Sequence, residues 1–136
     1  EKVLGLHEIN GDLYYFRRGG AYKYTQLGDM WQDSINYIDG KIYYFGHDGR
    51  AIKNRFYQWG NYWYYFYADG SAATGAVQIN GQQLYFDKNH GRQVKGAFAP
   101  DGHYYDENSG ELVTNQTRTI KGVTYHFDEN GNATKV

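Results

Sequence analysis

Residues 63–98 read WYYFYADGSAATGAVQINGQQLYFDKNHGRQVKGAF and contain the same pattern twice. Each copy has a short aromatic run that ends in phenylalanine, at Phe66 and Phe86, and a glycine follows four or five positions later. Aromatic residues favour strands, and glycine beside Asp or Asn supplies the positive φ angles of tight turns. The stretch therefore predicts short strands joined by tight turns.

The pattern repeats along the whole chain at intervals of about 20 residues. The last ring of each copy is called its anchor ring here, and the six anchor rings are Phe16, Phe45, Phe66, Phe86, Tyr105 and Phe127. We expect a single array of six β-hairpin units at 9–24, 38–54, 59–76, 79–97, 100–115 and 120–136. In each unit the aromatic strand is expected to pair with the short strand after the second glycine, such as RQVKG (92–96). Residues 21–37 break the spacing and are expected to form an extended loop or a decayed unit.

The repeat also predicts how the chain builds a core. A single hairpin is marginal in water, but hairpins that stack their anchor rings bury a continuous narrow core, as solenoid proteins do. No window of the sequence shows helical periodicity. The predicted fold class is therefore all-β, a solenoid of stacked β-hairpin repeats. The chain ends at GNATKV (131–136), where another unit would begin, so we expect a fragment of a longer array.

Alternation along the aromatic strands divides their side chains between two faces. The anchor ring and the residue two positions before it are expected to point into the core. The residue directly before the anchor ring is expected to lie on the opposite face, half exposed to solvent. This second set comprises Tyr15, Tyr44, Tyr65, Tyr85, Tyr104 and His126.

The composition argues against several classes of function. The chain has 14 Lys+Arg against 15 Asp+Glu and so lacks the basic excess that nucleic acid or an anionic membrane requires. It has no cysteine, and its histidines show no HxH or HExxH spacing, so we expect neither a metal site nor a cofactor. The acids Asp48, Asp69, Asp101 and Glu129 stand in predicted turns, where backbone roles are commoner than catalysis. We expect no enzymatic activity from this module itself.

An ING or DG turn, a YYF strand, a second DG turn and a following TG or KG resemble the cell-wall-binding and glucan-binding repeats of Gram-positive surface proteins. Residues 63–98 and HYYDENSGELVTN (103–115) are most similar to the glucan-binding domain, with YG-type repeats, of dextransucrase-type glucansucrases. The resemblance implies a left-handed superhelix in a secreted, cell-surface protein. It also implies non-catalytic binding of α-glucan, next to further repeats or to a catalytic domain that acts on sucrose.

The same resemblance implies pockets between adjacent hairpins, built from a stacking tyrosine and a Gln-x-Lys pair. Gln93 and Lys95 match this pair, whereas other units depart from it, with Ala51 and Lys53 for example. Glucose suits such a pocket, because a ring can cover its flat face while amide and ammonium groups meet its hydroxyls. The ligand expected is α-glucan polysaccharide or an isomalto-oligosaccharide. The candidate carbohydrate-binding residues are Trp63, Tyr65, Gln83, Tyr85, Gln93, Lys95, Tyr104, Tyr44, Lys53 and Thr74.

Other interpretations stay open. The tyrosines can serve packing alone, in which case the module is a ligand-free spacer. A choline-binding module that anchors a protein to teichoic acid is the nearest rival, because aromatic cages hold quaternary ammonium groups. Choline-type repeats usually place Trp directly after the strand-two glycine, where this chain has Ala76 and Ala97. A weaker resemblance links the repeats to the receptor-binding repeats of clostridial toxins, which also bind carbohydrate.

Overall fold

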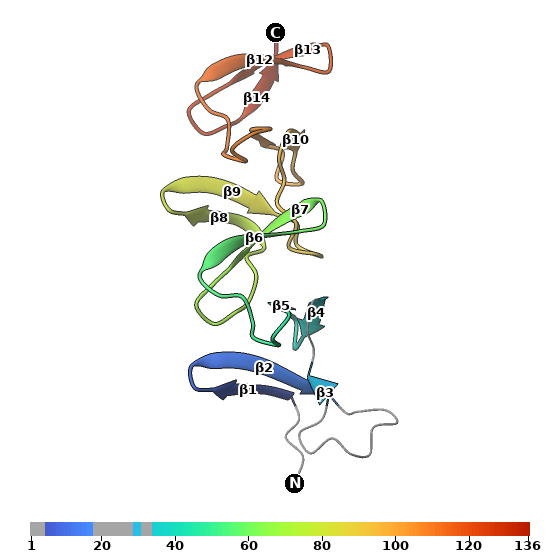
Figure 1. Ribbon diagram of the computed structural model, residues 1–136. Helices are drawn as coiled ribbons and strands as arrows, with labels where there is room; N and C mark the ends of the chain where they lie inside the picture. The colour runs from blue at the N-terminus through green and yellow to red at the C-terminus, as the bar shows by residue number, and fades with distance from the viewer. Residues whose placement is uncertain (1–4, 18–28, 31–33) are drawn as a thin grey trace. The chain divides into compact units, whose positions relative to one another are not determined.

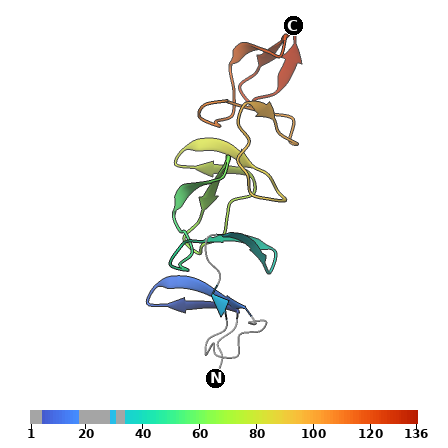
Figure 2. The same cartoon turned by 45° about the vertical axis from the view of Figure 1, so that its right-hand side comes forward.

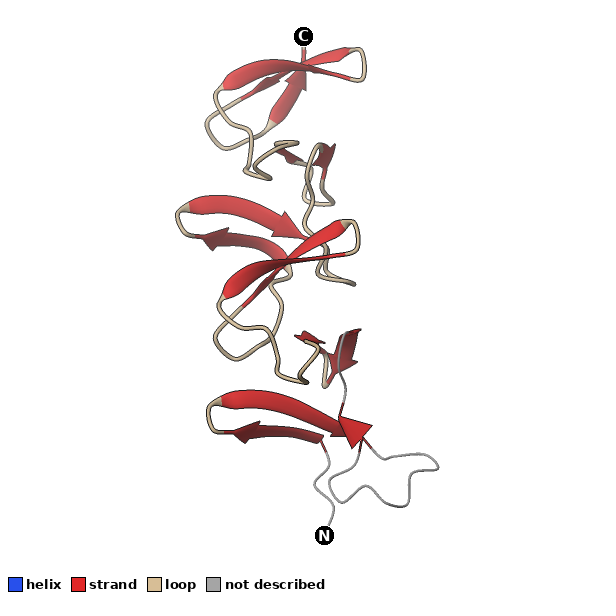
Figure 3. Cartoon of the chain, viewed as in Figure 1, coloured by secondary structure: helices blue, strands red, loops and turns tan. Residues whose placement is uncertain are grey.

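The computed structural model describes residues 5–17, 29–30 and 34–136. These residues form strands, turns and loops, without a helix among them and so without a helical membrane span (Figure 3). They divide into two compact units, described separately below. Unit 1 comprises the described residues up to Tyr57 together with Tyr65–Ala72, and unit 2 comprises Gln58–Tyr64 and Ala73–Val136.

The strands pair mostly as two-stranded hairpins (Figure 1). In unit 1, one sheet contains β1 (Gly5–Ile9), β2 (Asp12–Arg17) and β3 (Asp29–Met30), and a second contains β4 (Ser34–Ile38) and β5 (Lys41–Phe45). The division between the units falls within the hairpin of β6 (Arg55–Trp59) and β7 (Tyr62–Phe66). In unit 2, the sheets contain β8 (Gly75–Ile79) with β9 (Gln82–Phe86), β10 (Ala97–Phe98) with β11 (Tyr104–Tyr105), and β12 (Gln116–Ile120) with β13 (Val123–Phe127) and β14 (Ala133–Lys135). Figure 2 shows β8 and β9 side by side from a second direction.

Four of the long hairpins turn through two successive residues with positive φ, whereas in the hairpin of β6 and β7 only Gly60 has a positive φ. In the hairpin of β8 and β9 these are Asn80 (φ 53°) and Gly81 (φ 82°). Such a pair makes a type I′ turn, whose twist matches that of the flanking strands. The same combination occurs at Asn10–Gly11, Asp39–Gly40 and Lys121–Gly122. The prediction that these turns supply positive φ angles is therefore confirmed.

The main partner of the aromatic strand is not the predicted one, although in the last repeat β13 pairs both with β12 and with the predicted strand, β14. β9 pairs over five residues with β8, the strand before its turn, whereas Gln93 in the segment after the anchor ring makes an isolated bridge to Phe86. The unit boundaries predicted from sequence therefore fall inside the hairpins, next to their turns. The predicted unit 79–97, for example, begins at Ile79, which is the last residue of β8. Residues 34–37, predicted as loop or decayed unit, lie in β4. Residues 21–28 and 31–33 of that prediction lie outside the described residues.

The segment after an anchor ring joins its repeat to the preceding hairpin through a backbone hydrogen bond. In each case a backbone N–H of this segment donates to the carbonyl oxygen of the residue that stands three positions before an earlier anchor ring. The N–O distance is 2.8 Å in all four cases. The donor–acceptor pairs are Ala51–Leu13 and Ala72–Ile42 in unit 1, and Gln93–Trp63 and Leu112–Gln83 in unit 2. Contacts of each repeat with its neighbour are the basis of solenoid stability.

The anchor rings form the core, as predicted. Phe45, Phe66, Phe86 and Phe127 are 0% exposed, and Phe16 and Tyr105 are also buried. Burial of these large rings removes a substantial apolar area from water and so stabilises the stacked repeats.

The expected row of half-exposed tyrosines is wrong for Tyr44, Tyr85 and Tyr104, which are only 4%, 2% and 5% exposed. The ring of Tyr85 lies 5.8 Å from that of Tyr105 and packs in a cluster with Ala99. Alternation along a strand predicts the face to which a side chain points, but not whether that face is exposed. Here the following repeat covers the face opposite the anchor rings. These three tyrosines therefore cannot offer an open ring face to a ligand.

Candidate functional site

The ten residues predicted to bind carbohydrate are divided between the two units. Unit 2 contains Trp63, Thr74, Gln83, Tyr85, Gln93, Lys95 and Tyr104, and unit 1 contains Tyr44, Lys53 and Tyr65. Three of them, Trp63, Gln93 and Lys95, come together in unit 2 and are called the Trp63 cluster below.

Backbone geometry assembles the Trp63 cluster. The N–H of Gln93 donates to the carbonyl oxygen of Trp63, which lies on β7. The Nζ of Lys95 lies 5.4 Å from the centroid of the Trp63 ring, within the range of a cation–π contact. The same Nζ is 3.5 Å from the carbonyl oxygen of Asn108. Trp63 is 36% exposed, so the cluster combines an accessible aromatic ring, an amide and an ammonium group.

Gly110 leaves the space that the Gln93 side chain occupies. A Cβ at Gly110 would overlap Nε2 of Gln93 and would lie 3.3 Å from Cγ of Lys95. Gly110 also has a φ of 76°, which L residues rarely adopt. This glycine therefore lets the turn of one repeat approach Gln93 and Lys95 of the repeat before it.

The other predicted residues of unit 2 differ in exposure. Gln83 and Thr74 are exposed, while Tyr85 and Tyr104 are buried. The carbonyl oxygen of Gln83 accepts the hydrogen bond from Leu112 described above, which is a structural role.

In unit 1 the predicted tyrosines serve packing. The ring of Tyr44 lies 4.8 Å from that of Tyr57. Tyr65 is half-buried, and its ring makes edge contacts with the rings of Phe56 at 4.8 Å and Tyr67 at 5.6 Å. Tyr44 is therefore covered, whereas Tyr65 keeps part of its surface accessible.

Lys53 borders a cavity of about 630 Å³ in unit 1 whose charges are largely balanced. Its Nζ donates to the carbonyl oxygen of Gly11 at 2.9 Å and lies 3.7 Å from a carboxylate oxygen of Glu8. Arg50 in the same cavity pairs with Asp48 at 2.6 Å, and this hydrogen bond lowers the pKa of the Asp48 carboxyl. The cavity has no Gln-x-Lys pair, because Ala51 stands where Gln93 stands in unit 2.

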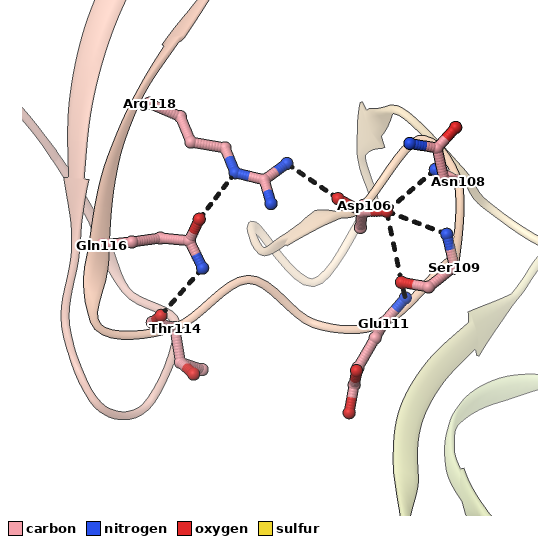
Figure 4. Close-up of polar contacts among 7 residues, drawn as sticks. All are labelled: Asp106, Asn108, Ser109, Glu111, Thr114, Gln116 and Arg118. Atoms are coloured by element: carbon pink, nitrogen blue, oxygen red, sulfur yellow. Dashed lines mark hydrogen bonds and ion pairs between the residues drawn. The ribbon is translucent and has the colours of Figure 1, made fainter.

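Sequence reasoning missed a polar network centred on Asp106 (Figure 4). Asp106 Oδ2 accepts hydrogen bonds of 2.8 Å from the backbone N–H groups of Ser109 and Asn108, and Oδ1 lies 2.9 Å from Nη1 of Arg118. The backbone donors, Ser109 first, together with Arg118 lower the pKa of Asp106 to about 2. Arg118 is fixed further because its Nε donates to Oε1 of Gln116 at 2.8 Å. A usable signal was present, since Asp follows the anchor ring directly at Asp87, Asp106 and Asp128.

Two family models match parts of the chain. Residues 73–116 match a choline-binding repeat, and residues 54–72 and 118–133 match a putative cell wall binding repeat. The matched part of the chain, from residue 54 to residue 133, belongs to the family of choline-binding and putative cell wall binding repeats.

The array is also similar to segments of streptococcal glucosyltransferases. It is 42% identical to Glucosyltransferase-I of Streptococcus downei over 138 residues, which cover 96% of this chain and 8% of that protein. It is 35% identical to Glucosyltransferase-S of Streptococcus mutans over 154 residues, which cover 93% of this chain and 10% of that protein. The chain thus spans a tenth or less of the length of these relatives.

A solved structure supports the fold. Choline binding protein F of Streptococcus pneumoniae matches with a TM-score of 0.75 and 23% sequence identity, over 96% of this chain and 45% of that one. At this identity the likeness concerns the fold alone. It confirms the predicted class, an all-β array of hairpin repeats like those of choline-binding solenoid proteins; the left-handed superhelix stays a prediction.

Proposed function

We propose that the array is a non-catalytic carbohydrate-binding module that retains α-glucan of the dextran type. The observation that carries the proposal is the similarity of nearly the whole array, at 35% and 42% identity, to segments of glucosyltransferases. A protein that builds a glucan polymer gains from a module that holds the product.

The Trp63 cluster is the proposed site. A pyranose has a flat apolar face that packs on an aromatic ring, and a rim of hydroxyls that accept from ammonium groups and exchange hydrogen bonds with amides. Trp63 would supply an accessible ring, Lys95 the ammonium group beside it, and Gln93 an amide from the segment bonded to Trp63. A neutral ligand also suits a chain with a net charge of -1.

Choline is the second candidate ligand, favoured by the match of residues 73–116 to a choline-binding repeat. We rank it below glucan because Ala76 and Ala97 stand where choline-type repeats usually place Trp, and because the Trp63 ring already has the ammonium of Lys95 beside it. A second cation next to Lys95 would be repelled.

The cell-wall-binding repeats and the streptococcal relatives support a cell-surface or extracellular location. We further propose that the parent protein is secreted and carries flanking repeats or a catalytic domain of the glucosyltransferase type.

Isothermal titration with isomaltotriose tests the proposal. A site with a millimolar Kd provides about 4 kcal/mol of binding free energy, so we expect a weak but saturable heat of binding. Trp63→Ala and Lys95→Ala should each weaken binding roughly tenfold, the equivalent of about 1.4 kcal/mol. Lys88→Ala removes an exposed lysine outside the cluster and is the matched control, with unchanged affinity expected.

The outcomes separate the candidates. Heat with choline but none with isomaltotriose would replace the glucan proposal with the choline one. No heat with either ligand, and none with dextran, would make the module a spacer.

A further inference from the structure

A second open surface of unit 2 combines apolar and polar side chains in the way that sugar-binding sites do. It lies at the hairpin of β10 and β11 and the sheet of β12 and β13, and is called the Phe98 groove below. Its apolar part has a cavity volume of about 370 Å³ and is lined by Phe98, Tyr104, Ile120, Val123 and Tyr125. Small-molecule sites in proteins commonly measure roughly 300–1,000 Å³.

The aromatic floor of the groove packs against neighbouring rings. Phe98 pairs with Tyr104 across the hairpin, and its ring centroid lies 5.2 Å from those of Tyr104 and Tyr125, both in edge-to-face geometry. Phe98 and Val123 nevertheless remain 39% and 37% exposed. Large apolar side chains that are fixed by neighbours and still accessible provide a preorganised surface for a flat apolar ligand face.

Polar groups border this floor. An adjoining cavity of about 230 Å³, which shares Tyr104, Ile120 and Lys121 with the apolar part, is also lined by Glu107, Arg118 and Thr119. The Arg118 guanidinium is held by Asp106 and Gln116, as described above. The rim thus offers an ammonium, a guanidinium, a carboxylate and a hydroxyl, which match the donors and acceptors of sugar hydroxyls.

We propose that the Phe98 groove is a second saccharide site, in which a pyranose ring lies on Phe98 and Val123 and its hydroxyls meet Lys121, Arg118 and Glu107. The inference rests on the proposed glucan-binding function. The cations Lys121 and Arg118 oppose a quaternary ammonium ligand, since like charges at short range repel one another. Of the residues in this site, only Tyr104 was predicted from sequence, because Phe98 stands outside the aromatic triplet of its repeat.

Two sites in one unit make the module bivalent for a polymer. Once a polymer is bound at the Trp63 cluster, its binding at the Phe98 groove is an intramolecular event. Linked sites can raise overall retention by roughly 10²–10⁴ over a single site when the ligand spans both. Long dextran should therefore be retained far more tightly than isomaltotriose.

A titration of the ¹⁵N-labelled chain with isomaltotriose, followed by ¹H–¹⁵N spectra, tests the inference. We expect two groups of amide signals to move, one around Gln93 and Lys95 and the other around Phe98 and Val123. Val123→Asp places a carboxylate on the apolar floor and should abolish the second group while the first is unchanged. Val136→Asp makes the same change at an exposed valine outside the groove and is the control.

A second variant leaves the fold undisturbed. Lys121 has a φ of 49°, a conformation that Asn adopts readily, as Asn80 does in the hairpin of β8 and β9. Lys121→Asn therefore removes the ammonium and keeps the turn. It should weaken the second site by roughly three- to tenfold, as expected for one lost hydrogen bond at an exposed rim.

The possible results distinguish this inference from the function on which it rests. Movement of the second group, sensitive to Val123→Asp and Lys121→Asn, supports the groove whether or not the first group moves. Movement of the first group alone overturns the groove and leaves the glucan function standing. No movement in either group overturns both, and movement of the second group with choline but not with isomaltotriose overturns the saccharide assignment.

Discussion

The backbone N–H of Gln93 donates a hydrogen bond of 2.8 Å to the carbonyl oxygen of Trp63. The bond joins the segment after one anchor ring to an earlier strand, and Lys95 stands two residues further along this segment. Side chains two apart in an extended segment share a face, and Gln93 and Lys95 both approach Gly110. The backbone contact that stacks the repeats therefore also assembles the Trp63 cluster.

Gly110→Ala should damage binding through Gln93. The added Cβ overlaps Nε2 of Gln93 and meets the positive φ of this position, so the amide must leave its place. We expect roughly tenfold weaker binding of isomaltotriose, measured by titration calorimetry.

Gly81→Ala is the control for Gly110→Ala. Gly81 has a φ of 82°, similar to that of Gly110, but a Cβ at Gly81 would meet nothing within 4 Å. Both variants should lose about 1–2 kcal/mol of stability to backbone strain, but only Gly110→Ala should lose affinity. Equal affinities of the two variants would show that Gly110 does not position Gln93.

Tyr85→Ala should destabilise the array, because its ring is buried against Tyr105. We expect a loss of about 3–5 kcal/mol in chemical denaturation, as for other buried rings. Trp63→Ala, by contrast, should cost less stability than Tyr85→Ala, because Trp63 is 36% exposed whereas Tyr85 is 2% exposed. A Tyr85→Ala variant that stays fully stable and binds glucan poorly would restore Tyr85 as a ligand residue.

Phe86→Ala tests the role of the anchor rings. Phe86 is 0% exposed, and truncating a buried phenylalanine costs about 3–5 kcal/mol. Ile9→Ala, at a position 42% exposed, is the control and should change stability by less than about 0.5 kcal/mol. Thermal unfolding of the two variants measures the difference, and similar midpoints would argue against a core built on anchor rings.

The repeat, the turns and the buried anchor rings could be predicted because each depends on local sequence. The burial of Tyr44 and Tyr85 could not be derived from alternation, which says nothing about what covers the second face of a hairpin. A signal was nevertheless present: Ile42, Tyr43, Tyr44 and Phe45 form an unbroken apolar run, all buried, as is typical of a strand covered on both faces.

The pairing of the hairpins was missed for a different reason. Strands such as QTRTI of β12 carry little apolar periodicity, so their sequence favours no strand, and only the type I′ turn and the partner strand fix them. The Trp63 cluster was found in part, since Gln93 and Lys95 stood out by spacing. The Phe98 groove depends on contacts between successive hairpins that no local pattern encodes.

Asp106 makes the stability of unit 2 depend on pH. Its folded-state pKa of about 2 lies below the roughly 3.9 of an unfolded Asp. The stabilisation is therefore complete above the unfolded value and is lost as the pH falls toward 2. Asp106→Asn should be less stable than the natural chain at pH 6, and the difference should shrink below about pH 4.

Denaturation curves at several pH values measure this effect. Glu129→Gln, which neutralises an exposed carboxylate in another turn, is the control. A difference in the free energy of unfolding between Asp106→Asn and the natural chain that stays constant down to pH 2 would contradict the role of the ionised carboxylate.

Electrophoresis of the folded chain through a native gel that contains dextran tests the central claim most directly. With a site at the Trp63 cluster the chain should migrate more slowly than in a plain gel, and excess isomaltotriose should restore its mobility. Mobility that dextran leaves unchanged would contradict glucan binding by this array.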